Sequence, residues 1–222
     1  MTSQRDTFLQ GEGDAYFRRN AAGYDASQAE ASTFQLDVLR PYLRAGGRVL
    51  EIGCANGLNL ERLRRSAGCE GAGVDPSAAA VATGQRDFPG LDLRVGTAET
   101  LPCEDGAFDV VLFGFCLYVT DRPLLPRVVA EADRVLRDGG FLAIVDFDPP
   151  TPVRRSYRHA EGMASFKTDH AKLFLGFPHY TLAEKRPFSH GGTGFHADPG
   201  ERLAVQVLYK DSGAGHGPIE TT

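Results

Sequence analysis

Short apolar segments alternate with amphipathic ones as far as residue 147 of the chain. The runs 49–52 and 141–147 are almost continuously apolar, which is typical of parallel strands buried on both faces. The stretch 122–138 instead repeats its apolar residues every three or four positions, which predicts an amphipathic helix. Strands are predicted at 49–52, 71–75, 91–95, 108–113 and 141–147, and helices at 28–44, after Gly57, from Ser77 and at 122–138, where Gly139-Gly140 end the last helix. This alternation predicts a doubly wound, Rossmann-like α/β fold.

The last third of the chain departs from this alternation. Two strand-like stretches, 180–189 and 202–209, are joined by a loop too short for a crossover helix, so we expect them to pair antiparallel. The prediction is therefore a seven-stranded sheet, mostly parallel with a C-terminal antiparallel strand, in a single domain spanning 1–222. Its expected parts are N-terminal cap helices (1–44), a cofactor-binding core (45–147), a substrate-pocket insertion (148–180), C-terminal strands (181–211) and a flexible tail (212–222).

Composition narrows the class of protein. The chain has 222 residues, of which 42% are apolar and 24% charged, with a net charge of -5 that argues against a nucleic-acid partner. No apolar run is long enough to span a bilayer, and residues 1–6 are polar, unlike a signal peptide. The four cysteines show no C-x-x-C spacing, so no zinc or redox site is indicated. We therefore expect a cytoplasmic protein, monomeric or homodimeric, with no membrane partner and no metal.

The stretch from Val49 to Gly57 carries the strongest chemical signal. It reads as a strand, a turn bounded by Gly53 and Gly57, and then a helix, which is how this fold places backbone amides against a ligand. The glycines lie four positions apart with Ala55 between them, which does not match the dinucleotide fingerprint. Glu51 also opposes a pyrophosphate, because an anion about 5 Å from a carboxylate is repelled by roughly 3 kcal/mol at an effective dielectric near 20. The alternative is an ordinary strand-to-helix turn with a surface glutamate.

This stretch resembles motif I of the class I S-adenosylmethionine-dependent methyltransferases, Glu/Asp-x-Gly-x-Gly-x-Gly, with Ala55 in place of the middle glycine. That cofactor has no phosphate and carries an ammonium and a sulfonium, so an acidic turn suits it. The resemblance implies that the turn binds the cofactor through Glu51, Gly53, Cys54, Ala55, Asn56 and Gly57. Asp75 lies 22 positions after Gly53, where a strand-terminal carboxylate takes the ribose hydroxyls, with Pro76 beside it. Alternatively, Asp75 only caps the helix that starts at Ser77.

Further cofactor contacts follow from the same resemblance. The segment Gly96–Pro102 is similar to the family's Gly-Asp-Ala-Glu-x-Leu-Pro segment beside the adenine, which assigns Thr97, Ala98 and Glu99 to that base. The end of the fourth strand implies contacts from Phe113, Gly114 and Phe115. An N-terminal segment that closes over the methionine end would contribute Tyr16, Asn20 and Tyr24, unless these residues only pack against the sheet edge.

The insertion 148–180 gathers aromatic, basic and titratable residues where this fold usually builds its substrate pocket. His159 and His170 are candidate general bases, since an attacking hydroxyl loses its proton during methyl transfer, although each is also consistent with packing alone. The Arg154-Arg155 pair and Arg158 are candidates for holding an anionic acceptor, or else they form a solvated face. Cys116 is interpreted as a small packed residue, because methyl transfer needs no covalent nucleophile.

The predicted function is methyl transfer from S-adenosylmethionine to a hydroxyl or amine of a small molecule by direct in-line displacement. The acidic surface and the compact insertion favour a small-molecule acceptor over RNA or protein, and the available histidines favour an oxygen acceptor. Two alternatives remain: a non-catalytic S-adenosylmethionine-binding regulator, and an NAD(P)-dependent reductase, which Glu51 opposes.

Overall fold

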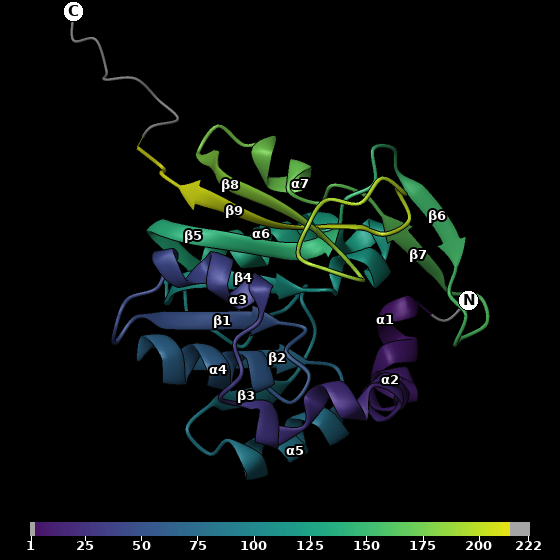
Figure 1. Ribbon diagram of the computed structural model, residues 1–222, viewed down its shortest axis with the longest axis horizontal. Helices are drawn as coiled ribbons and strands as arrows, with labels where there is room; N and C mark the ends of the chain where they lie inside the picture. The colour runs from purple at the N-terminus through teal and green to yellow at the C-terminus, as the bar shows by residue number, and fades with distance from the viewer. Residues whose placement is uncertain (1–2, 214–222) are drawn as a thin grey trace, which may run out of the picture.

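A seven-stranded sheet runs through the centre of the molecule (Figure 1). The computed structural model describes residues 3–213, so the predicted tail lies outside the described residues from position 214 onward. The strand order is β3-β2-β1-β4-β5-β9-β8, and β9 pairs antiparallel with both of its neighbours. The fold class predicted from the sequence is therefore confirmed. The strands of this sheet are β1 (Arg48–Ile52), β2 (Glu70–Asp75), β3 (Asp92–Val95), β4 (Phe108–Gly114), β5 (Leu136–Phe147), β8 (Tyr180–Ser189) and β9 (Arg202–Lys210).

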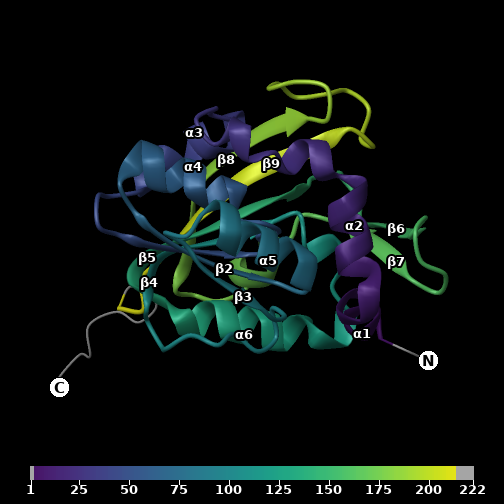
Figure 2. The ribbon, with the colours of Figure 1, turned by 90° about the horizontal axis from the view of Figure 1, so that it is seen from below.

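Helices cover both faces of the sheet (Figure 2). One apolar cluster joins alternate residues of β1, β4 and β5 to α3 and α4, and a second joins the other faces of these strands to α6 and α7. Burial on both faces explains why these strands are nearly continuous apolar runs in the sequence. The helices are α3 (Phe34–Leu39), α4 (Leu58–Ala67), α5 (Ala78–Asp87), α6 (Leu125–Val135) and α7 (Lys172–Leu175). Among the described residues, no helix is long and apolar enough to cross a membrane.

Two predicted helices are shorter than the sequence indicated. The helix expected at 28–44 is α3 followed by a 3₁₀ turn, Arg40–Tyr42, because Pro41 lacks the N–H that would continue the α-helical ladder. The helix expected at 122–138 begins as a 3₁₀ turn and ends at Val135. Gly139 and Gly140, expected to end it, instead lie inside β5, close to the point where its register with β4 shifts.

The N-terminal residues form a strap across the carboxyl ends of the strands. This strap, residues 4–28, begins with α1 (Gln4–Thr7), a π-helical turn (Phe8–Glu12) and α2 (Gly13–Arg19). The two helices stand beside the sheet, next to the hairpin made by β6 (Val153–Ser156) and β7 (Ala164–Lys167) (Figure 1). The insertion expected at 148–180 is thus this hairpin plus α7, and it lies outside the strap.

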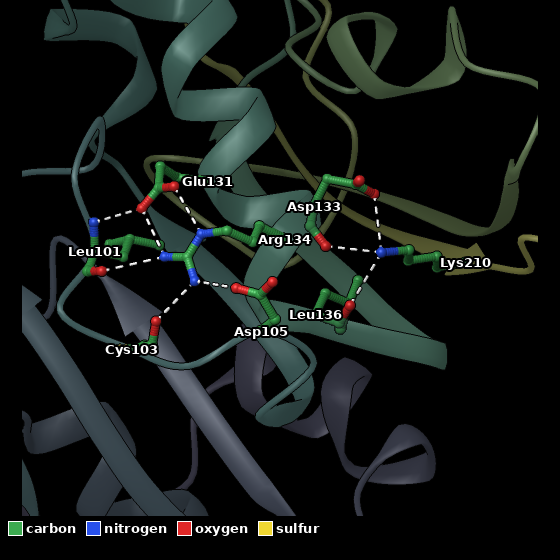
Figure 3. A network of polar contacts seen from close by, with 8 residues as sticks. All are labelled: Leu101, Cys103, Asp105, Glu131, Asp133, Arg134, Leu136 and Lys210. Carbon is green, nitrogen blue, oxygen red and sulfur yellow. Dashed lines mark hydrogen bonds and ion pairs between the residues drawn. The ribbon is translucent and has the colours of Figure 1, made fainter.

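The loop after β3 is fastened to α6 by one guanidinium (Figure 3). Arg134 donates hydrogen bonds to the carbonyl oxygens of Leu101 and Cys103, at 3.2 and 2.8 Å, and pairs with Glu131 and Asp105. The Leu101 N–H in turn donates to Glu131 at 2.7 Å. These contacts hold the segment 97–101 in place beside the ends of the strands.

Gly84 decides how closely α5 packs on the turn after β1. A Cβ at this position would lie 2.2 Å from the carbonyl oxygen of Asn56 and 2.4 Å from a methyl of Leu93. Glycine therefore sets the distance between α5 and the turn that follows β1.

We predict that Gly84→Ala destabilises the protein by about 2 kcal/mol or more, although alanine in a freely exposed helix would stabilise it by about 1 kcal/mol. The backbone at Asn56 cannot move aside as a flexible side chain would. Chemical denaturation measures the effect. Thr83→Ala on the same helix is the control and should stay within about 0.5 kcal/mol of the wild type. A Gly84→Ala protein as stable as this control would contradict the packing described.

Candidate functional site

A cavity of about 360 Å³ lies at the carboxyl ends of β1, β2 and β4, beneath the strap. This is where open α/β sheets bind ligands. Thirteen residues assigned to the cofactor from the sequence line it: Tyr16, Tyr24, Glu51, Gly53, Cys54, Ala55, Asp75, Pro76, Thr97, Ala98, Glu99, Gly114 and Phe115.

The turn after β1 is built from left-handed residues at alternate positions. Gly53, Ala55 and Gly57 have φ angles of 80°, 48° and 76°. A Cβ on Gly53 would lie 2.8 Å from the Cβ of Cys116, so this position requires glycine for space as well as for conformation. Ala55 adopts the left-handed conformation despite its side chain, at a cost of roughly 1–3 kcal/mol. Its N–H is held by the carboxylate of Asp75 at 2.8 Å.

Asp75 connects this turn to the next one. Its second carboxylate oxygen accepts the N–H of Ser77, also at 2.8 Å. The helix N-cap is Ser77, whose hydroxyl accepts the N–H of Ala80, so Asp75 is not the residue that caps α5. Burial raises the pKa of Asp75, and the two N–H groups oppose this shift. A carboxylate held in this way at a strand end suits a ligand with paired hydroxyl groups.

Glu51 is a buried acid with unused hydrogen-bonding capacity. Asn59 donates to its Oε1 at 3.1 Å, while Oε2 has no hydrogen-bond partner among the described residues. Burial raises the pKa of Glu51 to about 8, with the negative charge of Asp75 as a smaller contribution. A Cβ on Gly114 would lie 2.8 Å from Oε1, so this glycine leaves room for the carboxylate. An unpartnered buried carboxylate is costly and is satisfied best by a cationic ligand.

The segment 97–99 forms the far end of the cavity. The Thr97 hydroxyl donates to Glu99 at 2.9 Å, and Glu99 is buried. Arg5 of the strap reaches the same carboxylate, with 3.6 Å between Nη1 and Oε1. Arg5 is the one Lys or Arg among the described residues that line the cavity.

Polar contacts hold the strap down over the cavity. Asp14 of α2 accepts hydrogen bonds from the Ser77 hydroxyl and the Ala79 N–H, at 2.7 and 3.0 Å. Tyr16 of α2 interacts with the phenol groups of Tyr24 and of Tyr118, which lies beyond the end of β4. Desolvation raises the pKa of all three phenols, so they stay protonated at neutral pH.

Four residues assigned to the cofactor do not line the cavity. Asn20 is exposed and bonds the carbonyl of Tyr16, four residues before it. Asn56 is buried and donates to the carbonyl of Tyr24, thereby tying the strap to the turn. Gly57 packs against the side chains of Leu91 and Leu93, which follow α5. Phe113 points to the opposite face of the sheet and packs against Phe174.

His170 is not placed where a general base for this cavity would act. Its side chain is buried in the core outside the cavity, and neither ring nitrogen has a hydrogen-bond partner within residues 3–213. Nδ1 lies 3.5 Å from a carboxylate oxygen of Asp146. Burial lowers the pKa of His170 to about 4 and raises that of Asp146 to about 7. Neither His170 nor Asp146 lines the cavity.

The other candidates in the insertion also lie away from the cavity. His159 is exposed beside Tyr157 in the hairpin loop, and Arg154, Arg155 and Arg158 are exposed on the same hairpin. The strap separates this hairpin from the cavity, because residues 160–163 line a different groove on its outer side. No residue of the insertion 148–180 lines this cavity. No group of three metal-ligating side chains occurs in the part of the chain that the structure describes.

Sequence reasoning missed two contributions to the cavity. Asn59 lies eight positions after Glu51, in the first turn of α4, and its amide donates a hydrogen bond to the Glu51 carboxylate. The inner side of α3 lines the cavity with Thr33, Gln35, Leu36 and Leu39, where the sequence showed only an amphipathic helix. Cys116 also lines the cavity, and desolvation holds the pKa of its thiol well above the usual value, so it is no thiolate nucleophile.

Comparisons with known proteins agree with this geometry. Residues 50–144 match a family model described as a methyltransferase domain. The chain is 36% identical over 112 residues to "Probable phthiotriol/phenolphthiotriol dimycocerosates methyltransferase 2" of Mycobacterium ulcerans (strain Agy99), a match covering 49% of this chain and 43% of that protein. It is 33% identical over 114 residues to "Demethylmenaquinone methyltransferase" of Renibacterium salmoninarum, a match that covers 50% of this chain and 47% of that protein. The chain thus matches less than half the length of either relative.

One solved structure has a similar fold over most of this chain. The 1,6-didemethyltoxoflavin-N1-methyltransferase of Burkholderia thailandensis, with bound S-adenosylhomocysteine, superimposes with a TM-score of 0.66 at 15% identity, covering 90% of this chain and 87% of that one. These findings confirm the predicted fold. Residues 50–144 match a methyltransferase domain model, in agreement with the predicted family and with its cofactor, S-adenosylmethionine.

The raised pKa of Glu51 predicts that the unliganded protein loses stability as pH rises. Glutamate has a pKa near 4.5 when exposed and about 8 here, so the folded state holds a proton that the unfolded chain releases. The stabilisation is complete below about pH 4.5 and is lost as pH rises through 8. We expect Glu51→Gln to reduce the fall in unfolding free energy between pH 6 and 9 by a few kcal/mol.

Urea denaturation of the unliganded protein across this range provides the measurement. Glu70→Gln, at an exposed carboxylate in β2, is the control and should keep the wild-type slope. Asp146 contributes with the same sign, because its pKa of about 7 is also raised, so some slope remains in the Glu51 variant. Identical slopes in Glu51→Gln and wild type would show that the carboxylate is ionised in the folded state.

Proposed function

We propose that this protein transfers the methyl group of S-adenosylmethionine to a hydroxyl or amine of a small molecule by a single direct displacement. The observation that carries the proposal is the pair of buried acids at the ends of adjacent parallel strands. Glu51 and Asp75 face one cavity, and one oxygen of Glu51 has no hydrogen-bond partner among the described residues. Paired hydroxyls and a nearby cation in one ligand would satisfy both groups.

The residues around the cavity fit the cofactor part by part. Asp75 would accept hydrogen bonds from the ribose hydroxyls, and Glu51 would face the ammonium of the methionine moiety. The segment Thr97–Glu99 would border the adenine. Gly53 and Gly114 leave space at the turn and beside Glu51, because a side chain at either position would meet an atom 2.8 Å away. A pyrophosphate would instead meet the acidic groups of Glu51 and Asp75, whereas Arg5, the one Lys or Arg among the described residues that line the cavity, faces Glu99. This arrangement disfavours a nicotinamide cofactor.

When bound, the cofactor supplies an electrophilic methyl: the acceptor's lone pair bonds to this carbon as the carbon–sulfur bond breaks, the bond's electrons stay on sulfur, and the acceptor releases its proton. The contribution of the protein is then to align the acceptor and exclude water. The strap closes the cavity through Asp14 and Tyr16, and such orientation alone is worth several kcal/mol. Neither His159 nor His170 lines the cavity, so the acceptor's proton would pass to bulk water when the cavity opens to release the product.

Titration calorimetry distinguishes this proposal from its two rivals. The protein should bind S-adenosylmethionine and S-adenosylhomocysteine but not NAD, which a reductase would bind. Incubation of a metabolite extract with methyl-labelled cofactor should then transfer label to a small molecule. Binding without any transfer would favour a regulator, and tight binding of NAD would refute the proposal.

Asp75→Ala should weaken cofactor binding at least tenfold. The change removes two charge-assisted hydrogen bonds, together worth roughly 2–4 kcal/mol. Because the carboxylate also accepts two backbone N–H groups, circular dichroism must first show that the variant is folded. Asp92→Ala, at an exposed strand position outside the cavity, is the matched control. A folded Asp75→Ala protein with an unchanged dissociation constant would remove Asp75 from the site.

A further inference from the structure

The cavity continues beyond the groups assigned to the cofactor, and this extension points to the class of acceptor. Six side chains form a chamber between α3 and the sheet, which we call the α3 chamber: Thr33, Gln35, Leu36, Leu39, Leu112 and Val145. The inference rests on the proposed function, because it assigns the chamber to the molecule that receives the methyl group.

Strand register places the α3 chamber next to Glu51. Leu112 of β4 is the partner of Glu51 in β1, and Gly114 is the partner of Val145 in β5. Alternate residues of a strand share a face, so Leu112 and Gly114 lie on the α3 side of the sheet. Gly114 leaves room for the carboxylate of Glu51 on this face, because a Cβ at position 114 would lie 2.8 Å from its Oε1.

The α3 chamber is apolar and carries no charge of its own. Leu36, Leu39, Leu112 and Val145 are buried members of one hydrophobic cluster. Thr33 and Gln35 add neutral hydrogen-bonding groups at its rim. The nearest ionisable group along the strands is Glu51, an acid that offers an anion no positive partner. Arg5 is not available as a partner, because it pairs with Asp6 and reaches Glu99 beside the segment 97–99.

We propose that the α3 chamber binds the methyl acceptor, and that the acceptor is an uncharged, hydrophobic small molecule. An apolar group gains by leaving water for this chamber, whereas a carboxylate or phosphate would be desolvated there without a partner. Thr33 and Gln35 orient the acceptor by hydrogen bonding, as a few polar groups do in mostly apolar pockets. The basic residues of the β6–β7 hairpin take no part, because they lie on the outer side of the strap.

Two probes of equal ring size test this assignment. 2-Naphthol is neutral and hydrophobic, and 6-hydroxy-2-naphthoate adds one carboxylate. Their affinities are measured by calorimetry on protein saturated with S-adenosylhomocysteine, whose own binding is measured first. We expect 2-naphthol to bind at least tenfold more tightly than the naphthoate, and to bind without displacing S-adenosylhomocysteine.

Two arginine variants test whether the preference for 2-naphthol arises in the α3 chamber. Thr33 is at the N-cap of α3 but makes no capping hydrogen bond with its side chain, so Thr33→Arg removes none. The new guanidinium should reduce the preference for 2-naphthol at least tenfold, while S-adenosylhomocysteine affinity stays within twofold. Ser32→Arg adds the same charge at the exposed neighbouring position and should leave the preference unchanged.

Several results would overturn the assignment. Equal affinities for the two probes, or no binding of either, would mean that the α3 chamber does not select uncharged hydrophobic molecules. Competition between 2-naphthol and S-adenosylhomocysteine would assign the chamber to the cofactor instead. Equal shifts in both arginine variants would indicate a general charge effect. If S-adenosylhomocysteine itself fails to bind, the proposed function fails, and this inference fails with it.

Discussion

One carboxylate organises the ligand-binding end of this fold. Asp75 accepts an N–H from Ala55 in the turn after β1 and another from Ser77 at the start of α5. These bonds fix two strand-to-helix turns against each other across a parallel strand pair. They also hold Ala55 in a left-handed conformation that its side chain disfavours. The cavity depends on this connection, because its inner wall is formed by the same two turns.

The roof and the floor of the cavity are held by different forces. The floor is the sheet, whose alternate residues pack against α3 and α4 as a single apolar cluster. The roof is the strap, which is fastened mainly by polar contacts: Asp14 to the start of α5, Gln4 to the carbonyl of Val119 and Asn56 to the carbonyl of Tyr24. Polar contacts exchange readily with water, whereas an apolar core does not. The strap is therefore the part of the enclosure best suited to opening for a ligand.

Burial shifts the pKa of several titratable groups that line the cavity. Glu51 is uncharged at neutral pH in the unliganded protein, since its pKa is about 8, and the phenols of Tyr16, Tyr24 and Tyr118 remain protonated. A cationic ligand would reverse the shift at Glu51 by pairing with the ionised form. The cavity can therefore accommodate a positively charged group of a ligand. Among the described residues, it offers no basic side chain dedicated to an anion, because Arg5 faces Glu99.

Features that depend on local pattern could be predicted from the amino-acid sequence. Continuous apolar runs identified the buried strands, and the spacing from Glu51 to Gly57 and on to Asp75 identified the cofactor end, because a strand, a turn and a helix N-terminus are contiguous in the chain. Which residues lie opposite these elements depends instead on long-range packing. The side chain of His170 is buried in the core and the strap separates the insertion from the cavity, so residues that resembled a catalytic set do not face it. The inner side of α3 forms a wall of the cavity because it packs over Leu112 and Val145. These two residues lie far from α3 in the sequence, so no local pattern could predict the contact.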